Sequence, residues 1–148
     1  MERFPFSVRW SGSTATREYT RDAVAGAPGK VEIPLSAGDP AIGDLTRWNP
    51  EDLLGASLAT CHMLTFLALA AKVGVDVRSY EENGHAALGT VDRVTRVTTI
   101  VLAPTIRVAP GSDVEKARTM FEKAHKYCYI ANSITAEVVT QPDIVVDV

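Results

Sequence analysis

The two cysteines are the residues of this chain best suited to carry chemistry, because a thiolate is both a nucleophile and a metal ligand. Cys61 lies within a long apolar segment, and no Arg or Lys occurs within one helical turn of it. Apolar burial raises the pKa of a thiol, so the simplest interpretation of Cys61 is an inert core residue. For this thiol to react, we expect a cation to reach it from elsewhere in the fold or from a partner chain.

Cys128 supplies the second thiol, 67 residues further along the chain. It ends a segment with helical periodicity, where simple packing at a helix end is an alternative role. The sequence does not establish that the two sulfurs meet. If they meet, they form a peroxidatic and resolving pair: one thiolate attacks a peroxide and becomes a sulfenic acid, which the second thiol traps as a disulfide.

A metal site is the competing interpretation, because His62 adjoins Cys61 and His125 precedes Cys128 by three residues. Adjacent helical residues diverge by about 100°, and the closely spaced cysteine pair of structural zinc sites is missing. We therefore expect no metal and no cofactor, and we expect both histidines to be hydrogen-bonded or solvated. The chain also lacks a Gly-x-Ser-x-Gly motif and a phosphate-binding loop.

Composition limits the remaining possibilities. The 148 residues fit one domain, residues 1–148, and the net charge of −3 favours neither nucleic acid nor an anionic membrane as partner. The N-terminus has no apolar signal-peptide core, so we expect a cytoplasmic protein with reduced thiols. The apolar stretch 53–73 contains several polar residues, which predicts a core helix rather than a membrane span.

The element pattern predicts an α+β fold with a mostly antiparallel sheet. A helix is expected from a cap at Asn49 to about Val73, and a second from Ser112 or Asp113 to Tyr127. The first helix is apolar on nearly every face, so we expect protein all around it, either as a central core helix of one chain or with a partner subunit covering one side. Strands are expected over residues 4–10, 14–20, 30–35, 75–88, 93–108, 134–139 and 144–148, with a loop over 36–48 and a turn over 89–92.

The segment Asn49-Pro50-Glu51-Asp52-Leu53-Leu54, followed by Ala56 and by Ala59-Thr60-Cys61-His62-Met63-Leu64, resembles the central-helix signature of the OsmC/Ohr family. A second cysteine at the end of the second long helix, and the order of elements, are also similar to that family. The resemblance covers nearly the whole chain. It implies an intertwined homodimer in which antiparallel sheets wrap two long central helices.

The resemblance also implies a thiol-dependent peroxidase that reduces organic hydroperoxides, with Cys61 peroxidatic and Cys128 resolving. It implies recycling by a small dithiol or a lipoylated protein. Glu51 matches a carboxylate that orients a catalytic arginine, which we assign to Arg21 in Thr20-Arg21-Asp22. Arg17 and Arg47 are the alternatives, and Arg47 could instead form a local surface ion pair.

Helix geometry adds a prediction about the partner chain. Glu51 and Cys61 are ten residues apart on one helix, which displaces them by about 15 Å along the axis. We therefore expect the Arg–Glu pair of one chain to serve the thiol of the other. The alternative functions are an OsmC-fold binding module for an apolar ligand without turnover, and a structural dimer or redox sensor.

Overall fold

In the computed structural model, which describes residues 1–148, the longest element is the helix α1 (Pro50–Lys72). Asn49 caps it, because its Oδ1 accepts a hydrogen bond of 2.8 Å from the Asp52 N–H. The chain leaves the helix through Gly74, whose φ of 78° is a left-handed conformation that favours glycine. Both ends of the predicted helix are therefore confirmed.

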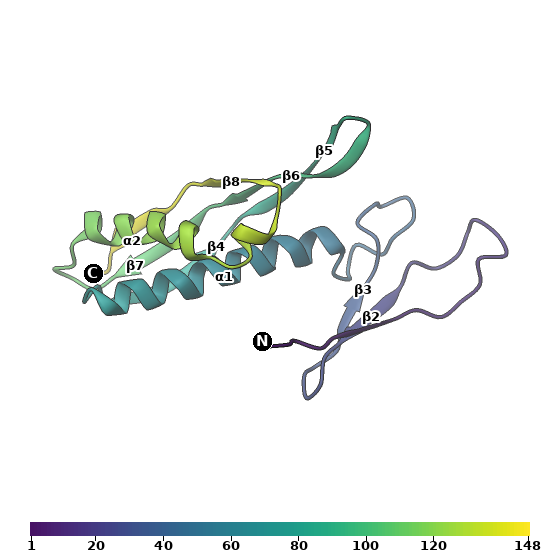
Figure 1. Cartoon of the computed structure of the whole chain (residues 1–148), viewed down its shortest axis with the longest axis horizontal. Helices are drawn as coiled ribbons and strands as arrows, with labels where there is room; N and C mark the ends of the chain where they lie inside the picture. Colours follow the sequence, from purple (N-terminus) through teal and green to yellow (C-terminus); the bar gives the residue numbers. More distant parts are fainter. The chain divides into compact units, whose positions relative to one another are not determined.

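The chain forms two units, Met1–Leu53 and Leu54–Val148. The N-terminal unit holds an antiparallel sheet in the order β1 (Ser7–Arg9), β2 (Ala23–Gly26) and β3 (Ile33–Leu35) (Figure 1). The predicted strand over 14–20 is wrong, and β2 takes its place. The loop between β1 and β2 is held by a side chain instead of by strand pairing, because Trp10 Nε1 donates to the Thr20 carbonyl at 2.8 Å.

The C-terminal unit contains two three-stranded sheets, in the orders β4-β7-β9 and β5-β6-β8. Each of the two long strands expected from the sequence is divided in two. Both strands are interrupted near Glu82 and Ala103. There the Ala103 N–H donates to the Glu82 carboxylate at 2.6 Å instead of to a carbonyl of a neighbouring strand. The bounds are β4 (Val77–Glu82), β5 (His85–Val91), β6 (Val94–Leu102), β7 (Pro104–Val108), β8 (Glu137–Thr140) and β9 (Asp143–Val146).

A second helix, α2 (Val114–Tyr127), starts at Asp113, whose side chain accepts from the Lys116 N–H. A short 3₁₀ turn, η1 (Ala131–Ser133), follows it. Strands β8 and β9 then pair in parallel with β6 and β7, while the other four of the six strand pairings are antiparallel. The α+β class and the mostly antiparallel pairing are confirmed; the intertwined homodimer and the single domain stay predictions.

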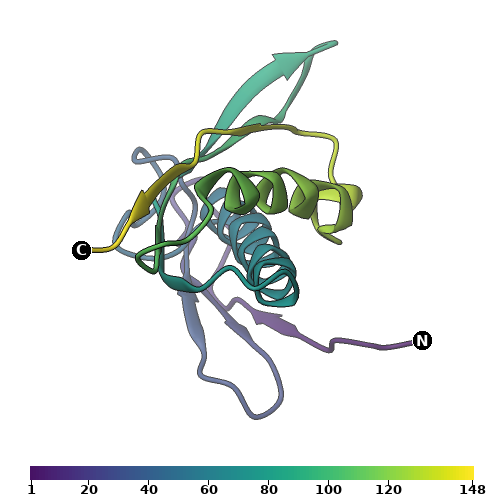
Figure 2. The same cartoon turned by 90° about the vertical axis from the view of Figure 1, so that its left-hand side faces the viewer.

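Within the C-terminal unit, α1 and α2 lie side by side in both views (Figures 1 and 2). Helix α1 buries only one stripe, at intervals of four residues: Leu58, His62, Phe66 and Ala70. Its other faces are partly or fully open, and Leu64 is 58% exposed, so the chain by itself does not surround the helix, and cover by a partner subunit stays a prediction. By length and composition alone α1 could also cross a membrane, a test that core helices of soluble proteins pass too.

Candidate active site

The structure brings the two cysteines together. Cys61 lies on α1 and Cys128 is the first residue after α2, and both belong to one apolar cluster with Leu58, Ile100 and Leu102. The Cys128 thiol lies beside the Cys61 sulfur and favours its thiolate. Both cysteines are free; Cys128 is fully buried, whereas Cys61 is partly exposed. The contact that the sequence left open is thus present, with the solvent-reachable sulfur on α1.

The segment Cys128–Ser133, which we call the thiol turn, directs consecutive backbone N–H groups at the two sulfurs. The N–H groups of Tyr129 and Ile130 lie near the Cys61 sulfur and favour its thiolate. The next N–H, of Ala131, donates to Cys128 Sγ at 3.4 Å. Successive N–H groups of this kind form a concave site that favours negative charge, so the thiol turn is built to stabilise a thiolate.

The pKa values of the two thiols are shifted in opposite directions. Partial burial raises the pKa of Cys61, but hydrogen bonds from the thiol turn and from the Cys128 thiol outweigh it, so the net pKa lies below the ordinary value. Burial raises the pKa of Cys128, and the neighbouring Cys61 raises it further. Hydrogen bonding to the charged form therefore favours the thiolate within the chain itself, and the cation expected from a partner chain stays a prediction.

Thr65 is a further polar neighbour of Cys61. Its hydroxyl donates to the Cys61 carbonyl at 2.8 Å, as helical threonines often do to the residue four positions earlier. The same hydroxyl lies within reach of the Cys61 sulfur and favours the thiolate there. Because it has one proton, it serves one acceptor at a time, and the well-formed carbonyl bond makes the carbonyl the principal one.

His62 departs from its expected role. Its side chain is fully buried, its ring is tilted by 53° against the Phe121 ring with the centroids 4.4 Å apart, and neither ring nitrogen has a hydrogen-bonding partner in the protein. Burial, followed by the charge of His125, lowers the pKa of His62 to about 4. The expectation of a hydrogen-bonded or solvated imidazole is wrong for His62, whereas His125 is exposed as expected. No group of three or more His, Cys, Asp or Glu side chains is placed to hold a metal ion.

Arg21 and Glu51 both belong to the N-terminal unit and form no ion pair with each other there. The Arg21 guanidinium lies over the Tyr19 ring, 3.5 Å from its centroid, and donates to the carbonyls of Tyr19 and Arg17. Glu51 occupies the first turn of α1, where an acid favours the helix dipole. The roles of both residues stay predictions.

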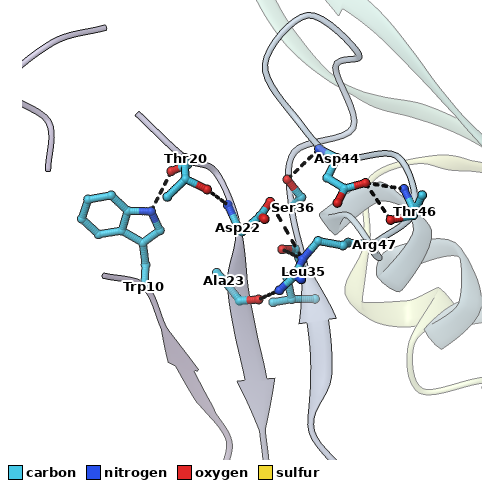
Figure 3. Close-up of polar contacts among 9 residues, drawn as sticks. All are labelled: Trp10, Thr20, Asp22, Ala23, Leu35, Ser36, Asp44, Thr46 and Arg47. Carbon is cyan, nitrogen blue, oxygen red and sulfur yellow. Dashed lines mark hydrogen bonds and ion pairs between the residues drawn. The ribbon is translucent and has the colours of Figure 1, made fainter. Parts of the chain in front are cut away.

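Arg47, one of the alternatives, has a structural role that the sequence did not predict. Its Nε donates to the Leu35 carbonyl and its Nη2 to the Ala23 carbonyl, each at 2.9 Å (Figure 3). Its guanidinium is also 3.9 Å from the Asp22 carboxylate, and it makes no ion pair with Glu51. Arg47 therefore fastens β2 and β3 to the loop before α1, which leaves it few free donors.

The sequence did not identify Tyr129 and Ile130 as site residues. They act through their backbone N–H groups, and the identity of a side chain does not reveal where its backbone points. One signal was present: a cysteine directly after a helix puts the next N–H groups outside the helical ladder, free to bond elsewhere.

Two contacting free thiols beside the first long helix of an α+β fold define a protein with a dithiol site. Residues 43–143 match the family model described as OsmC-like protein, and this is more than half of the chain. The chain therefore belongs to the OsmC/Ohr family, as its sequence resemblance indicated.

Known relatives agree with this assignment. An OsmC-like protein of unknown function from Vibrio cholerae O1 biovar eltor is 31% identical in sequence, with a TM-score of 0.87 over 96% of this chain and 99% of that one. An organic hydroperoxide resistance protein OsmC from Legionella pneumophila shares the fold, with 16% identity and a TM-score of 0.69 over 97% of each chain. The "Peroxiredoxin OsmC" of Escherichia coli K12 is 28% identical over 90 residues; the match spans 61% of this chain and 62% of that protein.

Proposed function

We propose that this protein is a thiol-dependent peroxidase that reduces organic hydroperoxides to alcohols. The observation that carries the proposal is the contact between two thiols of opposite acidity, with the more acidic and more accessible sulfur on Cys61. A peroxidatic cysteine needs thiolate character and access, whereas a resolving cysteine needs only to be close. The names of the Escherichia coli and Legionella relatives support the same chemistry.

The reaction balances with the two thiols and one external reductant. The Cys61 thiolate attacks one peroxide oxygen, the O–O bond breaks, and the alkoxide leaves and takes a proton to become the alcohol. Cys61 is then a sulfenic acid. The Cys128 sulfur attacks it, a disulfide forms, and the hydroxide leaves as water. A small dithiol or a lipoylated protein reduces the disulfide and restores both thiols.

Arg21 and Glu51 are proposed as the electrostatic part of this site. A bidentate Arg–carboxylate pair fixes a guanidinium while leaving donors for the thiolate and the leaving alkoxide. The pair acts on the thiol of a partner chain, because the helix rise separates Glu51 from Cys61 of its own chain by about 15 Å. Neither side chain is engaged in an ion pair within the chain, and both carbonyl bonds of Arg21 leave from one nitrogen, Nη1, so its Nε and Nη2 have no hydrogen-bonding partner in the chain.

The partner is proposed to be a second copy of this chain, in the cytoplasm. Helix α1 is apolar on faces that the chain itself leaves open, and Leu64 is 58% exposed. A large exposed apolar surface of this kind marks an interaction site. Covering it by a twofold-related α1 would bury both helices at once and bring each Arg–Glu pair toward the opposite thiol.

Peroxide consumption by freshly reduced protein with dithiothreitol tests the proposed function. We expect turnover of cumene and tert-butyl hydroperoxide that exceeds turnover of hydrogen peroxide, and its complete loss in Cys61→Ser. Failure of the wild-type protein to consume any of the three would overturn the proposal, and would favour a module that binds an apolar ligand without turnover.

The arginine is tested with a matched pair of variants. Arg21→Ala is expected to lower the rate of hydroperoxide consumption by about 10²-fold, the usual scale for loss of one group that stabilises a developing oxyanion. Arg17→Ala removes a neighbouring exposed arginine and is expected to leave the rate unchanged. Equal rates in both variants would remove Arg21 from the mechanism.

A further inference from the structure

The side-chain amide of Asn132 is the only polar side chain that ties the thiol turn back to α2. Its Nδ2 donates to the Lys126 carbonyl at 3.0 Å and to the Cys128 carbonyl at 2.9 Å. Its own backbone N–H also donates to the Cys128 carbonyl, at 3.2 Å. Both protons of the amide are thus used, and both bonds end on carbonyls at the C-terminus of the helix.

These carbonyls need such a partner. The last four carbonyls of a helix have no intrahelical donor, and Lys126 is in the last turn of α2. No glycine ends helix α2, because the residue that follows it is Cys128, in an extended conformation with φ −70° and ψ 115°. The Asn132 amide therefore replaces the usual glycine cap and fixes how the chain turns back after the helix.

The same turn carries the donors of the thiol site. Between the two ends that Asn132 joins lie the N–H groups of Tyr129 and Ile130, which lie near the Cys61 sulfur and favour its thiolate, and the Ala131 N–H, which donates to Cys128 Sγ at 3.4 Å. The direction of an N–H group depends on the backbone dihedrals on either side of it, so a turn that is free to rotate would no longer direct these groups at the sulfurs. The Ser133 hydroxyl adds a bond within the turn by donating to the Tyr129 carbonyl at 2.7 Å.

We propose that Asn132 is a positioning residue for the thiol site: its amide holds the thiol turn in the geometry in which the backbone N–H groups reach the Cys61 sulfur. Asn132 itself does not touch the sulfur, and its effect passes through the turn. The inference rests on the proposed function in giving Cys61 the role of attacking thiolate. Its consequence is that Asn132 sets the fraction of Cys61 that is ionised at neutral pH.

The test is the pH dependence of Cys61 alkylation by iodoacetamide, measured by mass spectrometry on the Cys61 peptide of the reduced full-length protein. Asn132→Asp keeps the shape but replaces both N–H donors with an oxygen that faces two carbonyls, and Asn132→Ala removes the group. Each is expected to move the midpoint up by roughly one pH unit, which is about a tenfold slower reaction at pH 7. The plateau rate at high pH is not expected to fall, since a more basic thiolate is intrinsically more nucleophilic.

Two further variants separate positioning from simple loss of stability. Asn132→Ser retains one donor and is expected to give an intermediate midpoint. Asn83→Asp makes the same chemical change at an exposed asparagine between β4 and β5, and is expected to leave the midpoint where it is in the wild type. A midpoint that is unchanged in folded Asn132→Asp, Asn132→Ala and Asn132→Ser would overturn the inference, whatever happens to the melting temperature.

The alkylation experiment distinguishes failure of the positioning role from failure of the proposed function. If the wild-type protein consumes no hydroperoxide but the Asn132 variants shift the alkylation midpoint, the positioning role stands and the peroxidase assignment falls. If the wild type consumes hydroperoxide and the midpoint does not respond to Asn132, the assignment stands and the positioning role falls.

Discussion

Two consecutive residues of α1, Cys61 and His62, meet opposite surroundings. Donor groups of the thiol turn and the Cys128 thiol surround the Cys61 sulfur and hold its pKa below the ordinary value. His62 points to the other side, against Phe121, and no protein group bonds either of its ring nitrogens. One side of the helix therefore supports a charged side chain, and the adjacent side supports only a neutral one.

The difference shows that burial alone does not decide ionisation. Desolvation acts on both groups in the same sense, against the charged form, and it is the largest single influence on each. What separates them is hydrogen bonding to the charged form: several donors outweigh desolvation at the sulfur, and no acceptor faces either nitrogen of the imidazole. A helix of uniform apolar character can thus carry one reactive and one inert titratable residue side by side.

The largest expected effect is on stability in acid. The pKa of His62 is about 4 in the folded chain, against an ordinary value of 6.5. The unfolded chain takes up a proton below about pH 6.5 that the folded chain refuses until about pH 4, so His62 costs stability as pH falls through this window. The full loss is about 3 kcal/mol, a several-hundredfold change in the unfolding equilibrium.

His62→Leu measures this contribution. Urea unfolding at pH 7 and pH 4 should show a stability difference about 3 kcal/mol smaller in His62→Leu than in wild type. His125→Gln is the control: it removes only the lesser influence on His62, so most of the acid sensitivity should remain. Equal pH dependence in wild type and His62→Leu would mean that the imidazole is not confined to its neutral form.

The next effect concerns the donor that Cys128 supplies. Cys128→Ala removes the thiol donor beside the Cys61 sulfur, and the Cys61 alkylation midpoint should rise by roughly one pH unit, a tenfold slower reaction at pH 7. Cys128→Ser keeps a hydroxyl donor and should shift the midpoint less. A lower midpoint in Cys128→Ala would show that this thiol opposes the thiolate instead of supporting it.

The smallest effect is expected at Thr65. Its hydroxyl is engaged mainly with the Cys61 carbonyl, so Thr65→Val should change the rate of Cys61 alkylation at pH 7 by less than about twofold. The substitution conserves shape and stays in the helix. A change as large as that in Cys128→Ala would place the hydroxyl proton on the sulfur and enlarge the donor set on that side of α1.

Much of the fold could be predicted because its determinants are local. The start of α1 depends on Asn49 and Pro50, and the start of α2 on Asp113, each within one turn of the helix it begins. The division of the long strands could not be predicted in this way, because it depends on the bond from Ala103 to Glu82, 21 residues away. Strand β2 was missed because Ala-Val-Ala-Gly carries almost no β-forming side chains.

The site residues show the same difference between features that depend on a single side chain and features that depend on distant contacts. The sequence identified Cys61 and Cys128 because their chemistry belongs to their side chains, and the structure places them in contact. The thiol turn was not foreseen, since its donors are backbone groups whose direction is fixed only when Asn132 fastens the turn. His62 was misjudged because a helix with apolar residues all around gives no sign of which face will be dry.

The separation of the two contacting cysteines along the chain has a mechanical consequence. A bond between Cys61 and Cys128 would close a ring of 67 residues that links α1 to the end of α2 and encloses β4 to β7. On the chain-entropy account, closing a ring of that size restricts the unfolded chain by about 4 kcal/mol. The oxidised form would then unfold at a higher temperature than the reduced form, so the protein would be most stable between oxidation by peroxide and reduction of the disulfide.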